Sequence, residues 1–137
     1  LFDRWLAAAP HIVRGDEHDY EERPFRDGEP PRLSADITTG AQLNESRARL
    51  WRYPPHTRGR RHAEGAQEEV FVVLEGTLTM LLGEPPERFD LAPQSVVTVS
   101  PGTALQMRNE GDGEVVVFAY GAPPVTGQGE FLDDVEL

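Results

Sequence analysis

Between residues 48 and 122 the chain alternates short apolar runs with glycine, proline, aspartate and asparagine, and this pattern constrains the fold more than any other feature. None of the runs is long or periodic enough for a helix, whereas runs of this length bounded by turn residues are typical of strands. Strands that recur in this way predict an antiparallel sandwich or a small barrel. We therefore expect an all-β fold.

The best-defined local unit is a predicted hairpin around Glu75 and Gly76, because two apolar strands, residues 70–74 and 77–82, flank a two-residue loop that ends in glycine. If Leu74 pairs with Thr77, alternation brings one set of side chains to a common face. That set is Glu69, Phe71, Val73, Leu78, Met80 and Leu82. A carboxylate among five apolar groups needs a cation, a donor or a raised pKa.

Two stretches of the sequence resemble the paired motifs of the cupin superfamily. YPP at residues 53–55, His62 and EEVFVVLEG at residues 68–76 resemble the first motif, G-x5-H-x-H-x(3,4)-E-x6-G. PGTALQMRN at residues 101–109 resembles the second, G-x5-P-x-G-x2-H-x3-N, more loosely. The resemblance covers roughly residues 48–122 and implies a double-stranded β-helix, or jelly-roll, barrel.

In cupins, the two histidines of H-x-H, the following glutamate and the second-motif histidine point into the barrel and surround one divalent metal. The resemblance places these positions at His62, Glu64, Glu69 and Leu105, so one histidine is replaced by glutamate and another by leucine. His62, Glu64 and Glu69 suit Mn, Fe(II) or Zn. The implied site is degenerate, and we expect either no metal or a weakly bound divalent ion.

The barrel interior is the predicted ligand pocket. Arg60 shares the face of His62 if residues 60–64 are extended, and its guanidinium would then clamp a carboxylate. The simpler alternatives are that His62 is a rim histidine paired with Glu69 and that the apolar residues are only core. The predicted lining is Arg60, His62, Glu64, Glu69, Phe71, Met80, Leu105 and Met107.

Composition narrows the functional classes. The chain has no cysteine, which excludes thiolate chemistry, and its 13 basic residues are all arginine, which excludes a Schiff-base lysine. A net charge of -11 opposes binding to nucleic acid. The apolar runs are far shorter than a membrane helix and no signal segment opens the chain, so we expect no membrane contact and a cytoplasmic location.

The chain is expected to divide into three parts. Residues 1–47 form an extension that packs on the barrel, with a short helix near Trp5 and an outer strand at residues 33–38. Residues 48–122 form the barrel core, and residues 123–137 a tail or an edge-covering arm. Because cupins usually pair, we expect a homodimer that buries the neighbourhood of Trp51 and Tyr53 or the edge of the outer strand.

The leading functional prediction is a single-domain cupin of unassigned activity that binds a small polar or acidic organic molecule inside the barrel. The alternative is a metal-dependent isomerase, lyase or dioxygenase that uses His62, Glu64 and Glu69 as ligands. A third class is a structural dimer with a dry, collapsed interior. The cupin fold hosts many activities, so the fold alone does not choose among these classes.

Overall fold

The structure is a computed structural model that describes residues 11–124 and 129–136 of the 137-residue chain. All the regular structure in these residues is β-strand, so the predicted all-β class is confirmed. The predicted short helix lies outside the described residues. Within the described residues no helix is long and apolar enough to cross a membrane.

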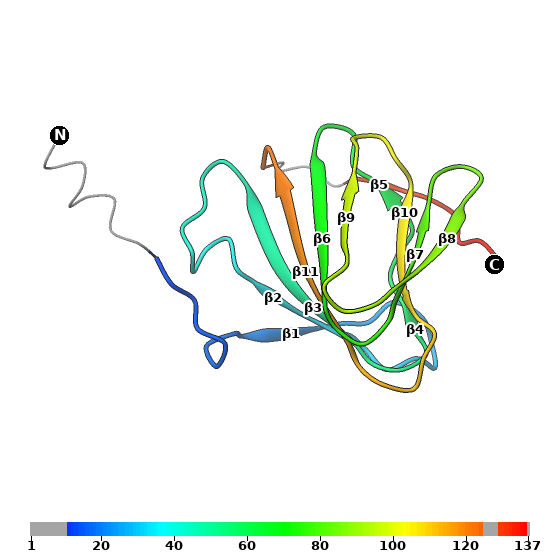
Figure 1. Cartoon of the computed structure of the whole chain (residues 1–137), viewed down its shortest axis with the longest axis horizontal. Coiled ribbons are helices and arrows are strands. Elements are labelled where there is room, and N and C mark those ends of the chain that lie inside the picture. Colours follow the sequence, from blue (N-terminus) through cyan, green and yellow to red (C-terminus); the bar gives the residue numbers. More distant parts are fainter. Residues whose placement is uncertain (1–10, 125–128, 137) are drawn as a thin grey trace, which may run out of the picture.

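The first of two antiparallel sheets has six strands (Figure 1). In spatial order it contains β1 (Tyr20–Arg23), β2 (Arg32–Asp36), β3 (Arg47–Tyr53), β11 (Val115–Ala122), β6 (Glu68–Glu75) and β9 (Val96–Val99). Strands far apart in the sequence are therefore neighbours, as a jelly-roll requires.

The second sheet faces the first across the interior. Its order is β12 (Glu130–Phe131), β5 (His62–Ala63), β10 (Leu105–Asn109), β7 (Leu78–Leu82) and β8 (Glu87–Leu91), and β4 (Thr57–Arg58) also pairs with β10. The two sheets together form the double-stranded β-helix that the sequence predicts.

The predicted pairing of the hairpin at Glu75 and Gly76 is wrong, although both strands exist. β6 pairs with β11 and β9, whereas β7 pairs with β10 and β8. Gly76, at φ 75°, turns the chain from one sheet into the other. A side chain there would collide with the carbonyl oxygen of Glu114. The turn therefore joins two sheets instead of closing one ladder.

The core nevertheless contains the apolar residues that the hairpin was expected to bring together. Alternate residues of a strand point to the same face whichever strand they pair with, so both strands still turn these side chains inward. The main cluster is Tyr53, Phe71, Val73, Leu78, Met80, Val99, Leu105, Met107, Val115 and Val117. This packing leaves the cavity at one end of the barrel.

The predicted outer strand at residues 33–38 appears as β2, which ends two residues earlier. The carboxylate of Asp36 accepts the backbone N–H groups of Thr38 at 2.9 Å and Thr39 at 3.4 Å, which favours a turn over further strand. β2 is paired on both sides, with β1 and β3. The open edge at residues 33–38 that the expected dimer contact would have covered is therefore absent.

The C-terminal segment crosses the outer face of the second sheet. The N–H of Leu132 donates to the carbonyl of Arg61 at 2.9 Å. The Asp134 carboxylate accepts from Arg58 at 2.7 Å, Gln106 at 2.9 Å and Arg108 at 3.3 Å. Gln106 and Arg108 are buried and also bond within the barrel, to the Gly59 carbonyl and to Glu110 respectively, so this segment adds acceptors to a buried polar network.

Candidate functional site

A cavity of about 570 Å³ opens between the two sheets. It takes residues from both sheets and from the N- and C-terminal parts of the described chain. Its polar lining is Arg23, Arg32, Thr38, Arg47, Arg49, Arg60, His62, Glu64, Gln67 and Glu69. The rest of the lining is Ala48, Trp51, Tyr53, Phe71, Leu105, Met107, Ala119, Gly121, Gly129 and Phe131.

Strand β3 supplies one wall. Arg47, Arg49, Trp51 and Tyr53 all line the cavity because residues two apart share a face of the sheet. Intervening Leu50 packs instead in a second apolar cluster on the outer face. Trp51 and Tyr53 meet edge to face, with ring centroids 5.9 Å apart. They therefore form the cavity wall, one of the two roles that the sequence allowed for them, and the predicted dimer contact around them stays a prediction.

Arg32, from the neighbouring strand β2, covers these rings. Its guanidinium carbon lies 4.9 Å from the centroid of Trp51 and 5.5 Å from that of Tyr53. One terminal nitrogen donates to the Tyr53 hydroxyl at 3.3 Å, whereas the buried Nε has no acceptor within the described residues. Protein atoms cover this Nε, so Arg32 can meet a ligand only through its terminal nitrogens, which belong to the cavity lining.

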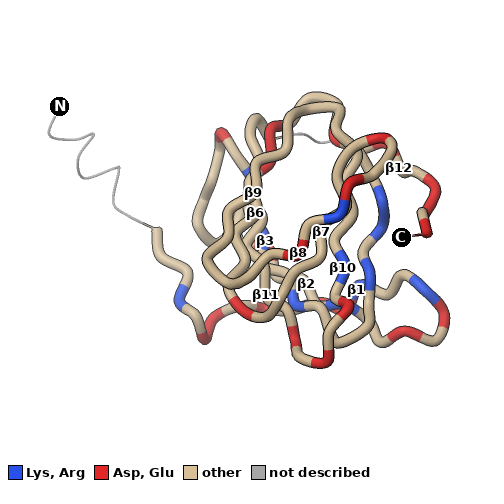
Figure 2. The backbone as a smooth tube through the Cα atoms, turned by 45° about the vertical axis from the view of Figure 1, so that its right-hand side comes forward, with Lys and Arg blue, Asp and Glu red and all other residues tan. Residues whose placement is uncertain are grey.

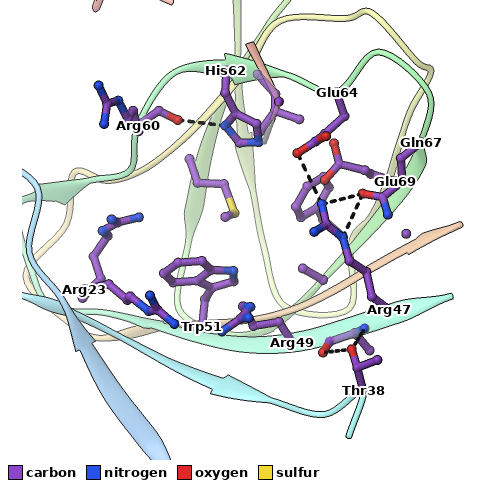
Figure 3. Close-up of a pocket in the computed structure, with 18 of the residues that line it drawn as sticks. Arg23, Thr38, Arg47, Arg49, Trp51, Arg60, His62, Glu64, Gln67 and Glu69 are labelled. Atoms are coloured by element: carbon purple, nitrogen blue, oxygen red, sulfur yellow. Dashed lines mark hydrogen bonds and ion pairs between the residues drawn. The ribbon is translucent and has the colours of Figure 1, made fainter. Parts of the chain in front are cut away.

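Arg49 lies beside this aromatic wall (Figure 3), and the carboxylates of Asp36 and Glu21 act on it from a distance without forming a salt bridge among the described residues. Its one side-chain hydrogen bond among the described residues runs to the Ser34 hydroxyl at 2.7 Å. Burial lowers the pKa of Arg49 below its ordinary value, and the positive charge of Arg23 lowers it further. Both causes oppose the guanidinium charge, so a bound anion would stabilise it.

Arg47, at the start of the same strand, in contrast has side-chain acceptors within the chain. It donates to the Glu64 carboxylate at 3.3 Å and to the Gln67 side-chain oxygen at 3.0 and 3.3 Å. Gly121 makes room for this arrangement because a Cβ there would overlap the Gln67 amide. Figure 3 shows Glu64, Gln67 and Glu69 grouped around Arg47, away from Arg23.

Glu69 belongs to this polar group but has no hydrogen-bond partner among the described residues. Burial raises its pKa to about 7, and the nearby charge of Glu64 adds to the rise, while Arg47 opposes it. The raised pKa was one of three outcomes that the sequence allowed for a carboxyl group in this position.

His62 occupies the rim of the cavity on β5. Its Nδ1 lies 3.0 Å from the backbone carbonyl oxygen of Arg60. Since a carbonyl oxygen only accepts, Nδ1 carries the proton, and Nε2 of the neutral ring is left as an acceptor. No hydrogen bond joins His62 to Glu69 in the part of the chain described, so the suggested pairing of these two is absent.

The residues implied as metal ligands do not fit a ready-made metal site. Glu64 is held by Arg47, and the position of the missing histidine, Leu105, lies directly opposite His62 in the ladder between β5 and β10. Over residues 11–124 and 129–136, no group of three or more His, Cys, Asp or Glu side chains is arranged to hold a metal ion. His62, Glu64 and Glu69 therefore line one cavity without converging on one point.

The structure brings together seven of the eight residues predicted for the pocket. Arg60, His62, Glu64, Glu69, Phe71, Leu105 and Met107 line the cavity. Met80 does not line it, because it is fully buried in the core behind the wall. The Arg60 guanidinium stacks on the Phe131 ring at 4.0 Å from its centroid.

The sequence predicted only one of the five arginines that line the cavity, Arg60, and did not predict Arg23, Arg32, Arg47 or Arg49. Arg47 and Arg49 had a usable signal, since they precede Trp51 and Tyr53 at the same period of two. Arg32 and Phe131 had none, because each reaches the cavity through long-range pairing, of β2 with β3 and of β12 with β5.

Comparison with known proteins agrees with this architecture. The family model described as a cupin domain matches residues 49–120. No curated protein matches the sequence.

Solved structures with the same fold are distant in sequence. A sugar phosphate isomerase of the cupin superfamily from Silicibacter pomeroyi is 18% identical with a TM-score of 0.70, over 81% of this chain and 74% of that one. A Klebsiella pneumoniae protein with a double-stranded β-helix domain is 17% identical with a TM-score of 0.70, over 90% and 97%. A predicted oxalate decarboxylase from Thermotoga maritima is 18% identical with a TM-score of 0.72, over 82% and 99%. These likenesses establish the fold alone.

Proposed function

The chain belongs to the cupin domain family, and on that premise we propose that it binds a small organic acid inside its barrel. One observation carries the proposal. Five arginines and two glutamates line the cavity, although the whole chain has a net charge of -11. The interior is thus cationic in an acidic protein, whose acidic residues are spread over the strands and loops (Figure 2).

The arginines that would hold the acid are those without an internal counter-ion. Within the described residues Arg32, Arg49 and Arg60 form no salt bridge with a carboxylate, whereas Arg47 pairs with Glu64. A partly buried guanidinium keeps its full set of donors and its charge, so a carboxylate bound bidentately would stabilise it. Trp51, Phe71 and Met107 offer apolar surface for the carbon skeleton of the ligand.

The test is calorimetric titration with a panel of small carboxylates. Arg49→Gln removes the central cation and should weaken binding at least about tenfold, the scale of one charge-assisted hydrogen bond. Arg88→Gln is the matched control, because Arg88 is an exposed arginine on β8 that pairs with Asp90. Equal affinity in the two variants, or no binding of any carboxylate, would contradict the proposal.

The alternative is a metal-dependent enzyme with His62, Glu64 and Glu69 as ligands for Mn, Fe or Zn. It would require Glu64 to leave Arg47, with which it forms an ion pair at 3.3 Å. Binding of an organic acid needs no such rearrangement, because its donors already line the cavity. An organic acid is therefore favoured over a metal ion as the ligand of this cavity.

A homodimer is the proposed assembly, through the outer face of the first sheet. Facing residues of five neighbouring strands form an apolar row there: Ala35, Leu50, Phe118, Val72 and Val96. Val96 is 61% exposed. Ala35 and Leu50 are already buried by their own chain, so a second copy would cover the end of the row at Phe118, Val72 and Val96, and an obligate pair would bury roughly 2,000 Å² or more.

Light scattering at micromolar concentration tests the assembly. Val96→Glu should shift the protein from dimer to monomer, because it puts a charge in the contact. Phe89→Glu, at an exposed apolar residue on the other sheet, should leave the dimer intact. A monomeric parent chain near 15.2 kDa would overturn this assembly without affecting the ligand proposal.

A further inference from the structure

We infer that the organic acid is a polyhydroxy acid, whose carboxylate binds at Arg32 and Arg49 and whose distal hydroxyl groups donate to Glu69 and its neighbours. This inference rests on the proposed function, since it names the chemical class of the acid. It follows from an asymmetry of the cavity, which has donors on one side and acceptors on the other.

The donor side is the pair of arginines around Trp51. Arg32 lines the cavity and forms no salt bridge with a described residue, and Arg49 has a hydroxyl as its one side-chain partner in the described chain. Neither contributes an acceptor of its own. A ligand group that fits here must be anionic and must accept several hydrogen bonds, as a carboxylate does.

The acceptor side is the group around Arg47. The Glu69 carboxyl group receives no hydrogen bond from any described residue, and Nε2 of His62 accepts when Nδ1 holds the single ring proton. The one strong donor nearby, Arg47, is already shared between Glu64 and Gln67. A partly buried acceptor without a donor is costly, so the ligand must bring donors to this side.

Hydroxyl groups fit this side better than a second carboxylate. A dicarboxylate would set acceptors against Glu69 and Glu64 and add like-charge repulsion. A purely apolar tail would leave the Glu69 carboxyl group desolvated and still unpaired. A hydroxyl donates one hydrogen bond and brings no charge.

The length of the acid follows from the geometry of β3. Arg47 and Arg49 are two residues apart on one strand, which separates their Cα atoms by about 7 Å. We take the same spacing for the two ends of the ligand, which places the donating hydroxyl several carbons from the carboxylate. An α-hydroxy acid of three carbons would be too short to reach both.

The experiment compares four compounds by calorimetry. D-Gluconate carries a carboxylate and distal hydroxyls on six carbons, hexanoate lacks the hydroxyls, sorbitol lacks the carboxylate, and lactate has an α-hydroxyl alone. We expect gluconate to bind at least about tenfold more tightly than each of the other three, because each lacks one set of hydrogen bonds.

Variants at Glu69 assign the hydroxyl contact. Glu69→Leu should weaken gluconate about tenfold and leave hexanoate unchanged, whereas Glu69→Gln, which keeps an acceptor oxygen, should retain most of the affinity. Glu69→Gln also serves if the leucine variant fails to fold. Arg88→Gln should match the parent chain with every compound.

The outcomes separate this inference from the proposal beneath it. Hexanoate or lactate binding as tightly as gluconate, with Arg49→Gln still weakening them, would overturn the polyhydroxy class and leave the organic-acid site standing. Loss of affinity for hexanoate and gluconate alike in Glu69→Leu would also overturn the hydroxyl contact. Failure of every acid to bind, or sorbitol binding as tightly as gluconate, would overturn both.

Discussion

Replacing Glu69 by glutamine should stabilise the ligand-free protein at alkaline pH and change little at acid pH. Burial, with the charge of Glu64, raises the pKa of Glu69 to about 7 from an ordinary value of 4.5. Between these two values the unfolded chain releases the proton and the folded chain keeps it. Stability contributed by the neutral carboxyl group is therefore lost as pH rises from 4.5 and is fully lost above 7.

The size of the effect follows from the same two values. The interval from 4.5 to 7 at about 1.36 kcal/mol per pH unit sets an upper bound of about 3 kcal/mol. Glu69 is only partly buried and lines an open cavity, so solvent screening reduces this figure, and we expect about 1 to 2 kcal/mol. For a chain of this size that difference corresponds to about 5 °C in Tm.

The assay is thermal and urea unfolding from pH 4 to pH 8.5, after dialysis against a chelator. The Glu69→Gln curve should coincide with the parent near pH 4 and rise above it by pH 8. Glu68→Gln is the control, since Glu68 is the exposed neighbour on the other face of β6. Parallel curves for the parent and Glu69→Gln across the whole range would refute the reasoning.

Three further predictions concern the rest of the molecule. Asp134→Ala should cost about 1 to 3 kcal/mol in urea unfolding, because it removes the carboxylate that Arg58, Gln106 and buried Arg108 share and leaves Arg108 only the carboxylate of Glu110 at 3.5 Å, and unchanged stability would contradict this. Gly76→Ala should cost more than about 1 kcal/mol in the same assay, because φ is 75° and a Cβ would meet the Glu114 carbonyl, whereas unchanged stability would show that the turn can relax. Elemental analysis of chelator-free protein should give less than one equivalent of Mn, Fe or Zn, and adding these ions should raise Tm little, whereas one tightly held equivalent would favour the enzyme alternative.

The inward faces of the strands could be predicted from the sequence, and their partners could not. Phe71 and Met80 lie in the core because alternation within a strand is a local property. Their pairing is set by segments far away in the chain, with Phe71 opposite Ala119 and Val97, and Met80 opposite Met107 and Phe89. A tight turn at Gly76 is compatible both with a hairpin and with a connection between two sheets. The local sequence pattern does not distinguish them, and the predicted hairpin is wrong.

For the candidate site, too, some residues could be predicted from the sequence and others could not. Its acidic side lies within the first cupin motif, so motif spacing located His62, Glu64 and Glu69. Its cationic side comes from β2 and β3, which lie largely outside the motifs, and Arg32 reaches it only because β2 pairs with β3. Motif matching found the positions where relatives would hold a metal and missed the residues particular to this chain.

The pattern of arginine pairing is the strongest argument for an external anion. The chain has 24 acidic residues for 13 arginines, so carboxylates are not scarce. On the second sheet the arginines have internal partners: Arg58 and Arg108 pair with Asp134, and Arg61 pairs with Glu84. The same chain leaves Arg32 and Arg49 without a salt bridge to a carboxylate within its described residues, and both arginines line the cavity. A carboxylate of the chain itself beside these arginines would occupy the cavity and cancel the positive charge that an acid needs in order to bind. The absence of such a carboxylate is therefore best explained by a ligand that supplies it.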